Sequence, residues 1–282
     1  MNIAKENRAI EYLRAFEPYN EPYFLCYSGG KDSDTVRILA ELAGVKYDLV
    51  HNLTTIDAPE TYYYVKSVGA EIVLPSKSMW QLIVENGMPP TRLVRYCCKA
   101  LKEGTGAGRV KITGVRRAES VNRARNNDVI KIIGKPKTVR KLAENAEVDY
   151  HLSKKGGLLL SDDSDNNRRF VEDIYKTATV NLNPIVDWTD GDVWEFLHYH
   201  GCESNPLYQC GYNRIGCVGC PMKNTKGMLA DFERYPKYRN LYVLAFERMI
   251  KRRAERGLPP YKDWRCGEDV IRWWIGGRAN ER

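Results

Sequence analysis

The chain has 282 residues, a formal net charge of +8 and no apolar run of the length that a membrane-spanning helix requires. Its length suits one large domain or a domain with an appendage, and its first residues lack the apolar core of a signal peptide. Several of the eight cysteines stand in tight pairs that suit a metal better than a disulfide, so we expect a cytoplasmic protein.

Short apolar runs alternate with helix-like segments through the first half of the chain. Strands are predicted over residues 22–27, 46–51, 70–74 and 111–115, and helices over residues 5–16, 34–43, 59–68 and 77–86. Such alternation is typical of parallel βαβ units. The sequence therefore predicts an α/β fold with a doubly wound, mainly parallel sheet.

The second half of the chain is less regular. A helix is expected from about residue 119, and the polar residues 161–169 are predicted to be a mobile loop. Regularity returns at residue 183, where Thr189 or Asp190 is placed to cap a helix, and the last fifty residues read as mainly helical. We expect a nucleotide-binding domain over residues 1–225 and a helical C-terminal extension over residues 226–282.

The most informative segment joins the first predicted strand to the helix after it. Here the chain reads Ser28-Gly29-Gly30-Lys31-Asp32-Ser33. A strand, a glycine turn and a helix N-terminus together present unpaired backbone N–H groups and a positive dipole end to a phosphate. Lys31 adds a mobile positive charge, and the two serine hydroxyls can donate hydrogen bonds.

This loop is not a Walker P-loop, because Leu25 and Asp32 occupy positions where that motif needs a glycine and a Ser or Thr. The segment instead resembles the pyrophosphate loop (PP-loop) of the ATP pyrophosphatases. Members of that group split ATP between its α and β phosphates and form adenylated intermediates. The alternative is an ordinary glycine-rich turn between a strand and a helix.

The cysteines form a second constellation. Cys97 and Cys98 are adjacent, and Cys217 and Cys220 form a Cys-x-x-Cys loop, with Cys210 nearby in sequence. Thiolates are the ligands that iron–sulfur clusters and zinc favour. These are five candidate ligands for four positions, so one of them is not a ligand. The group that they would bind is a [4Fe–4S] cluster or a structural zinc ion, and the third alternative is that no metal is bound. Cys26 and Cys202 read more simply as a packing residue or a thiol outside any metal site.

The positive charge is unevenly distributed. Ten Lys and Arg residues lie between Thr91 and Arg125, against Glu103 and Glu119, and a second run occupies Lys251–Arg253. Such runs favour a polyanionic partner such as nucleic acid, although solvated helix faces also produce them.

At this point the chain resembles the phosphoadenosine phosphosulfate (PAPS) reductase superfamily. The matching segments occur in the family's order: Ser28–Ser33, Thr54–Thr61, Arg95–Lys99, Gly114–Arg123, Asn183–Trp188 and Arg214–Pro221. The resemblance implies an adenine nucleotide α-hydrolase-like (HUP-type) fold, with the nucleotide bound at Ser28, Gly29, Gly30, Lys31, Asp32 and Ser33. It also matches Cys97, Cys98, Cys217 and Cys220 to the cluster positions of iron–sulfur adenylyl-sulfate reductases. Cys210 corresponds to a ligand position in related DNA phosphorothioation proteins and remains a contender.

Two departures separate this chain from the true sulfonucleotide reductases. Those enzymes usually replace the loop lysine, whereas this chain keeps Lys31 and Asp32, as expected of a protein that stabilises departing pyrophosphate. They also carry a near-terminal cysteine nucleophile in a mobile tail. Here Cys266 precedes Val270, Ile271 and Trp274, which read as a packed helix. The chain is therefore most similar to the phosphorothioation and sulfurtransferase-like branch.

The resulting hypothesis is an ATP-dependent adenylating enzyme that acts in sulfur transfer. Lys31, Asp32 and Arg116 are the predicted catalytic residues, and Mg²⁺ is expected to bridge the phosphates. Arg117 and Arg123 are expected to bind phosphate or sulfate oxygens bidentately. Asp57, like Glu60, is a candidate for ribose or Mg²⁺, against the simpler interpretation of an acidic first helical turn.

The acceptor is the least determined part of the hypothesis. The basic segments favour a nucleic acid, as in DNA phosphorothioation, with a cysteine desulfurase as sulfur donor. One alternative is an adenylyl-sulfate or PAPS reductase that makes sulfite. Another is a nucleic-acid-binding module with a structural cluster.

Overall fold

The computed structural model describes residues 2–259 and 261–276. By packing, the chain divides into two compact units, and each is assembled from separate stretches of sequence. The first comprises the residues up to His51, Tyr63–Ile72 and Gly106–Ile215. The second comprises Asn52–Tyr62, Val73–Thr105 and the residues from Gly216 onward. The expected boundary between residues 225 and 226 is a different division of the chain and stays a prediction.

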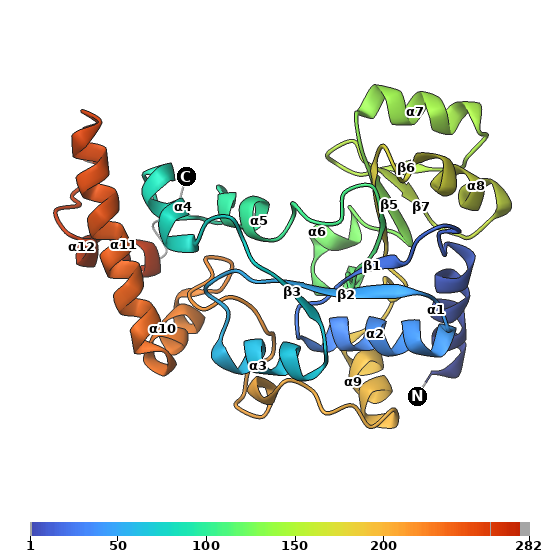
Figure 1. The fold of residues 1–282 in the computed structure, drawn as a ribbon, viewed down its shortest axis with the longest axis horizontal. Coiled ribbons are helices and arrows are strands. Elements are labelled where there is room, and N and C mark those ends of the chain that lie inside the picture. The colour runs from blue at the N-terminus through green and yellow to red at the C-terminus, as the bar shows by residue number, and fades with distance from the viewer. Residues whose placement is uncertain (1, 260, 277–282) are drawn as a thin grey trace. The chain divides into compact units, whose positions relative to one another are not determined.

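The first unit is built around a sheet that has eight strands in the described part of the chain, in the order β3-β2-β1-β4-β8-β5-β7-β6 (Figure 1). The strands are β1 (Tyr23–Cys26), β2 (Tyr47–Asn52), β3 (Glu71–Val73), β4 (Val110–Ile112), β5 (Ile130–Ile133), β6 (His151–Leu152), β7 (Leu158–Leu160) and β8 (Thr179–Leu182). Strand β1 pairs in parallel with β2 and β4, and β4 pairs in parallel with β8. This confirms the predicted α/β fold with a mainly parallel sheet.

The other end of the sheet is antiparallel, which the sequence did not indicate. Strand β5 runs antiparallel to both β8 and β7, and β7 runs antiparallel to β6. These strands lie in the stretch where the periodicity weakens. They are only two to four residues long, too short to leave a clear alternation in the sequence.

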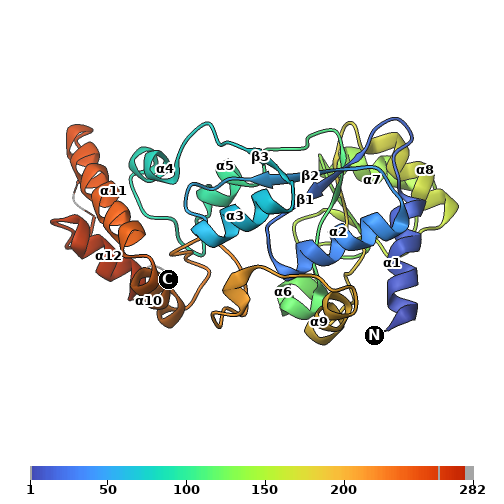
Figure 2. The ribbon, with the colours of Figure 1, turned by 60° about the horizontal axis from the view of Figure 1, so that its bottom comes forward.

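Helices of the first unit are α1 (Ile3–Ala15), α2 (Lys31–Ala43), α6 (Val121–Ala124), α7 (Pro136–Asn145), α8 (Asp165–Ile174) and α9 (Asp190–Tyr199), and α3 (Pro59–Ser67) ends in it. Helix α2 packs against α1 and α9 (Figures 1 and 2). Buried apolar side chains from α1, α2, α3, α7, α8 and α9 and from β1, β4, β5 and β8 form one core, with Leu13, Leu39, Ile112, Leu182 and Phe196 at most 1% exposed. This core fixes the strand ends and helix starts that carry the site.

The prediction of a mobile loop over residues 161–169 is wrong for residues 165–169. Asp165–Ile174 forms helix α8, which follows Ser164. Phe170, Val171 and Ile174 are buried at helical spacing. The polar composition of residues 161–169 describes the exposed beginning of this helix, while the apolar residues that anchor it follow directly after.

The second unit is mainly helical. Its helices are α4 (Met79–Asn86), α5 (Tyr96–Leu101), α10 (Thr225–Arg234), α11 (Pro236–Glu255) and α12 (Gly267–Ile275), which confirms the expected helical C-terminal region. Helix α11 packs against α4, α10 and α12. Edge-to-face and tilted aromatic contacts join Trp80, Phe232, Phe246 and Trp274 to the fully buried Tyr242.

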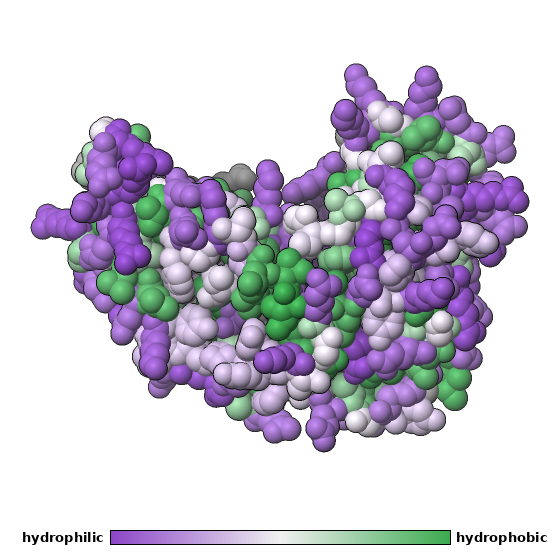
Figure 3. Space-filling model, in the orientation of Figure 1, coloured by the Kyte–Doolittle hydropathy of each residue, from purple (hydrophilic) through white to green (hydrophobic). Residues whose placement is uncertain are grey.

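Within the described residues, no helix combines the length and apolar character needed to cross a bilayer. Hydrophilic residues dominate the surface over α7 and over α11 in the face drawn in Figure 3. The basic run Lys251–Arg253 lies near the end of helix α11, and Lys251 and Arg252 are exposed.

Candidate functional site

The loop between β1 and α2 has the geometry of a phosphate cradle. Gly29 has a φ of +70°, which places it in the left-handed region, and Gly30 precedes the first residue of α2. The Ser33 hydroxyl accepts a hydrogen bond from the Gly30 N–H (3.1 Å) and donates one to the Gly30 carbonyl (2.7 Å). The Ser28 hydroxyl donates to Ser33 (3.2 Å). The two serines predicted to bind nucleotide thus brace the turn.

A later segment of the first unit covers this turn. The Lys31 backbone N–H donates to the Tyr208 hydroxyl (2.8 Å), and the Asn205 amide donates to the Gly29 carbonyl (2.9 Å). Both residues belong to the segment that contains the short 3₁₀ helix η2 (Pro206–Tyr208). A Cβ on Gly30 would lie 3.3 Å from the Tyr208 hydroxyl, so glycine allows this close approach.

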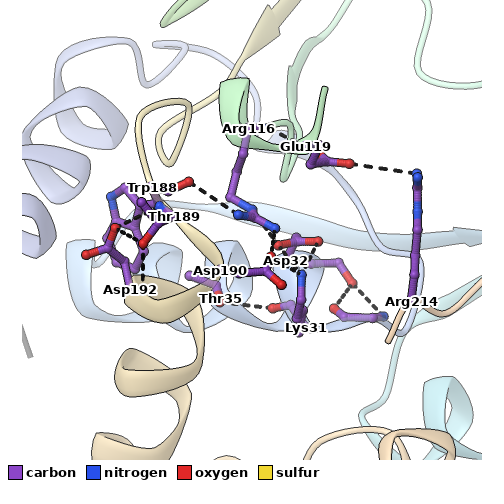
Figure 4. A network of polar contacts seen from close by, with 12 residues as sticks. Lys31, Asp32, Thr35, Arg116, Glu119, Trp188, Thr189, Asp190, Asp192 and Arg214 are labelled. Carbon is purple, nitrogen blue, oxygen red and sulfur yellow. Dashed lines mark hydrogen bonds and ion pairs between the residues drawn. The ribbon is translucent and has the colours of Figure 1, made fainter. Parts of the chain in front are cut away.

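Four charged side chains meet beside the turn (Figure 4). Arg116 donates from Nε to Asp32 (2.7 Å) and from Nη2 to Asp190 (2.5 Å), and its Nη1 donates to the Trp188 carbonyl (3.3 Å). The Lys31 ammonium contacts Asp32 (3.2 Å) and Asp190 (3.1 Å). Lys31 is 5% exposed and Arg116 2% exposed, so two nearly buried cations are held by two carboxylates. The three residues predicted to be catalytic are therefore brought together.

The path of β4 explains how Arg116 reaches the loop. The chain leaves β4 past Gly114, where an added Cβ would lie 2.8 Å from the Asp32 carbonyl oxygen. Burial alone would lower the pKa of Arg116, but Asp32 and Asp190 raise it. For Asp190 the directions are opposite: partial burial alone would raise its pKa, but hydrogen bonds from Arg116 and Lys31 lower it. Both pKa shifts favour the charged forms of Arg116 and Asp190.

The other two predicted arginines have different surroundings. Arg117 forms ion pairs with Asp128 (2.5 Å) and Asp187. Arg123 pairs with Glu119 (3.1 Å), and Asp32 and Arg116 are near enough to influence its pKa, which burial lowers. Arg123 therefore lies at the margin of the network, whereas Arg117 is engaged by carboxylates outside it. Their predicted role in nucleotide binding stays a prediction.

The four predicted ligand cysteines belong to the second unit. Cys97 and Cys98 lie in α5, and Cys217 and Cys220 lie in the loop before α10. A hydrogen bond with Cys98, together with burial and the nearby Cys217 and Cys220, raises the pKa of Cys97, while the same bond lowers the pKa of Cys98 to about 6. The charge of Cys217 also raises the pKa of Lys102. The four cysteines are thus close enough for their charges to interact.

The Cys217–Cys220 loop is firmly held within the second unit. The Val218 N–H donates to the Ile56 carbonyl (2.8 Å), and the Tyr242 hydroxyl donates to the Val218 carbonyl (3.0 Å). Gly219 has a φ of +67°, and its N–H donates to the buried Asp231 (2.8 Å). A four-thiol set fits an iron–sulfur cluster by the chemistry of its donors. Among the residues that the structure describes, no three His, Cys, Asp or Glu side chains are grouped to hold a single metal ion.

The remaining cysteines differ from this set. Cys210 is exposed and belongs to the first unit. Burial raises the pKa of Cys26 to about 11 and also raises that of Cys202. Cys266 directly precedes α12, where its N–H donates to Asp269 (3.2 Å). All eight cysteines lie in the described residues, and none forms a disulfide.

Asp57 and Glu60 have structural partners in the second unit. Asp57 accepts a hydrogen bond from the Thr54 N–H (2.7 Å) and so closes the turn that follows β2. Glu60 pairs with Arg234 (2.8 Å) and accepts a hydrogen bond from the Tyr235 hydroxyl (2.8 Å). These contacts match the simpler interpretation of both carboxylates, and the predicted role of Asp57 in nucleotide binding stays a prediction.

Many residues of the basic segments serve the fold itself. Arg92 donates to the carbonyls of Pro221 and Lys223, and Arg109 donates to Asp48. Arg253 donates to the Gly87 carbonyl. The exposed basic side chains of the first basic segment are Arg92, Arg95, Lys99, Lys102 and Arg125, and of these Arg92 is hydrogen-bonded to the chain and Lys102 interacts with Cys217. The charge available to a polyanion is therefore smaller than the sequence suggests.

Sequence reasoning missed two residues of the site. Asp190 was considered only as a helix cap, although it directly follows the segment after β8, which neighbours β4 in the sheet. That adjacency was the signal that could have placed it near Arg116. Tyr208 reaches the loop across 177 residues, and no local pattern marks it.

A parallel sheet, a glycine turn at the end of β1 and buried cations at the start of α2 define an α/β protein with a phosphate-binding type of loop. The family model described as "Phosphoadenosine phosphosulfate reductase domain" matches residues 22–223 of this chain. The chain belongs to this family. The loop at Ser28–Ser33 and the motifs that contain Cys97, Cys98, Cys217 and Cys220 lie within the matched region.

Individual relatives are distant. The Methanocaldococcus jannaschii protein MJ0066 is 26% identical over 248 residues, which cover 82% of this chain and 43% of that protein. The chain thus spans less than half the length of this relative. Among solved structures, the phosphoadenylyl-sulfate reductase of Candida auris is similar with a TM-score of 0.44 and 15% identity, covering 75% of this chain and 89% of that one. The U34-tRNA thiolase NcsA of Methanococcus maripaludis, determined with its [4Fe–4S] cluster, has a TM-score of 0.37 and 10% identity, covering 93% and 82%.

Proposed function

We propose that this chain is an ATP-dependent adenylating enzyme that acts in sulfur transfer, with a nucleic acid as acceptor, as in DNA phosphorothioation. The observation that carries the proposal is the nearly buried Lys31 at the start of α2, held beside Arg116. A family member that only bound a ready-made adenylyl sulfate would have no need to stabilise a pyrophosphate leaving group with two buried cations.

The proposed reaction is an attack by an acceptor oxygen on the α-phosphorus of ATP. The bond from that phosphorus to the oxygen bridging to the β-phosphorus breaks, and pyrophosphate leaves with the bonding electrons. Lys31 and Arg116 stabilise the charge that develops on the leaving oxygens, and the helix α2 N-terminus adds its dipole. Asp32 orients both cations through its contacts of 3.2 Å and 2.7 Å. Mg²⁺ would neutralise the remaining phosphate charge.

Cys97, Cys98, Cys217 and Cys220 would hold a [4Fe–4S] cluster, and zinc is the alternative for the same thiols. When bound, a cluster supplies electron transfer or a site for sulfur. The chain's own contribution is the Cys217–Cys220 loop, which the hydrogen bond from the Gly219 N–H to Asp231 holds in place. The sulfur donor in this proposal is a separate cysteine desulfurase.

The test is pyrophosphate release by the anaerobically purified protein, supplied with ATP and with DNA, tRNA, adenylyl sulfate or PAPS in parallel. We expect release that depends on a nucleic acid and falls by at least about a hundredfold in Lys31→Met. Lys176→Met is the matched control, because Lys176 is an exposed lysine of the same unit that pairs with Glu21. Without ATP cleavage under any condition, the proposal fails.

The main rival is a reductase that makes sulfite. Thioredoxin-dependent sulfite release from adenylyl sulfate would establish it and would require a reactive cysteine. Cys266 is the candidate, yet its position at the start of α12 is constrained by Gly267, where an added Cβ would lie 2.3 Å from the Val243 carbonyl oxygen. Salt-sensitive DNA binding without turnover would instead indicate a nucleic-acid-binding module.

Metal content tests the cysteine assignment separately. We expect iron and acid-labile sulfide in the anaerobic protein, and their loss when any of Cys97, Cys98, Cys217 or Cys220 is replaced by Ser. Cys210→Ser and Cys26→Ser are expected to keep the iron. Zinc without iron would point to the structural alternative, and iron lost in Cys210→Ser but kept in Cys97→Ser or Cys98→Ser would reassign the fourth ligand.

A further inference from the structure

Two oxygen atoms of the network, Asp32 Oδ1 and Asp190 Oδ1, each accept from both cations. Asp190 Oδ1 lies 2.5 Å from Arg116 Nη2 and 3.1 Å from Lys31 Nζ (Figure 4). Two nearly buried cationic donors that converge on one point define an anion position, because guanidinium and ammonium groups both donate charge-assisted hydrogen bonds to carboxylate and to phosphate oxygens. Asp190 places its own carboxylate oxygen at that point.

The Asp190 side chain can move away from the two cations more easily than that of Asp32. It is 67% exposed, against 27% for Asp32, so rotation into water costs it little. The start of α9 does not depend on it, since Thr189 accepts from the Asp192 N–H and Asp192 accepts from the Thr189 N–H. Rotation of Asp190 would present Arg116 Nη2 and Lys31 Nζ together, while Asp32 would continue to hold Arg116 Nε.

We propose that the Asp190 carboxylate is an internal competitor for the anion position formed by Lys31 and Arg116, and that a phosphate oxygen of the substrate displaces it. This rests on the proposed function, which places pyrophosphate at these cations. Asp190 weakens the binding of polyphosphate and, by returning to the cations, assists the release of pyrophosphate. It is a positioning residue that acts through Lys31 and Arg116.

A role for Asp190 as a Mg²⁺ ligand predicts the opposite effect. In that case loss of its carboxylate would weaken the binding of a Mg²⁺–phosphate complex, whereas loss of a competing anion strengthens the binding of phosphate itself. Pyrophosphate titrations in EDTA and, separately, with Mg²⁺ therefore separate the two roles. A Mg²⁺ ligand predicts weaker binding in the Asp190 variants when Mg²⁺ is present, whereas a competing anion predicts tighter binding in both conditions.

The experiment is calorimetric titration of the full chain with inorganic pyrophosphate at low ionic strength, in EDTA and, separately, with Mg²⁺. We expect Asp190→Asn and Asp190→Ser to bind pyrophosphate about tenfold more tightly than the wild type, which is the size expected for removing one partly exposed charge near the anion. The matched control is Asp165→Asn. Asp165 is similarly exposed (76%) and is the first residue of helix α8, as Asp190 is of α9, but it pairs with the exposed Arg168. Its variant is expected to stay within about twofold of the wild type.

Unchanged, weakened or undetectable pyrophosphate binding in both Asp190 variants overturns the inference, as does an equal gain in Asp165→Asn. Thermal unfolding of each variant shows that α9 remains folded. The failure of the proposed function looks different. Tighter pyrophosphate binding in the Asp190 variants without any ATP cleavage would support the inference about Asp190 and contradict the proposed function. ATP cleavage with unchanged pyrophosphate affinity in these variants would support the proposed function and contradict the inference.

Discussion

Replacing Arg116 with Met tests whether the charged network stabilises the first unit as well as the site. Arg116 is 2% exposed and donates to Asp32, Asp190 and the Trp188 carbonyl. Methionine has a comparable reach but no donor, so the variant leaves the Trp188 carbonyl and one face of Asp32 without a hydrogen-bond donor. We expect the free energy of unfolding to fall by about 3 kcal/mol.

The magnitude follows from the exposure of the three acceptors. Hydrogen bonds to charged groups contribute about 1.5–3 kcal/mol when buried. The carboxylates of Asp32 and Asp190 are 27% and 67% exposed, so both can turn to water, and together they account for about 2 kcal/mol. The buried bond to the Trp188 carbonyl adds about 1 kcal/mol.

Urea unfolding monitored by tryptophan fluorescence measures the change, and with a slope of about 2–3 kcal/mol per molar the midpoint should fall by roughly 1 M. Arg168→Met is the control, because Arg168 forms a surface ion pair with Asp165 in which both side chains are well exposed. It is expected to cost less than about 0.5 kcal/mol. Equal stability losses in the two variants would refute the reasoning from burial.

Two further predictions concern other positions. Burial raises the pKa of Asp34 from 3.8 to about 6, so the folded chain binds this proton more tightly than the unfolded chain, and the associated stability is present below pH 4 and lost as the pH rises to about 6. This pKa difference corresponds to roughly 3 kcal/mol in the free energy of unfolding. Asp34→Asn should therefore remove the fall in stability between pH 4 and pH 6, and an unaltered pH dependence of unfolding would contradict the prediction. Gly219→Ala should lower the free energy of unfolding by at least about 2 kcal/mol, because the residue has a φ of +67° and a Cβ would lie 2.6 Å from the Phe232 ring. Gly216→Ala, where a Cβ meets nothing within 4 Å, should change stability little, and similar melting temperatures for the two would contradict the steric argument.

Local patterns predicted the parts of this molecule whose causes are local. The run Tyr23–Cys26 and the glycines after it specify a strand and a turn within ten residues, so the loop at Ser28–Ser33 could be identified directly. The helices α1, α2 and α4 likewise have their apolar spacing and their ends in the same short windows.

Contacts between distant residues could not be predicted in this way. Asp190 meets Arg116 across 74 residues and Tyr208 meets Lys31 across 177, and neither partner carries a sequence signal for the other. Helix α8 was missed because its exposed first turn and its buried residues fall in adjacent windows of opposite character. Burial also decides which arginines face solvent, so the basic segments overstated the charge available to a partner.

The division of the second unit into separate stretches sets an order for biosynthesis. Helix α4 is made long before α11, against which it packs, and the Trp274 indole donates to the Pro90 carbonyl across 184 residues. At about 10–20 residues per second, Cys97 and Cys98 leave the ribosome several seconds before Cys217 exists. During that interval the buried Met79 and Ile83 lack their helical partner. The four thiols can therefore be gathered only after the Cys217–Cys220 loop has been made, so any loading of this site has to wait for both stretches of the second unit.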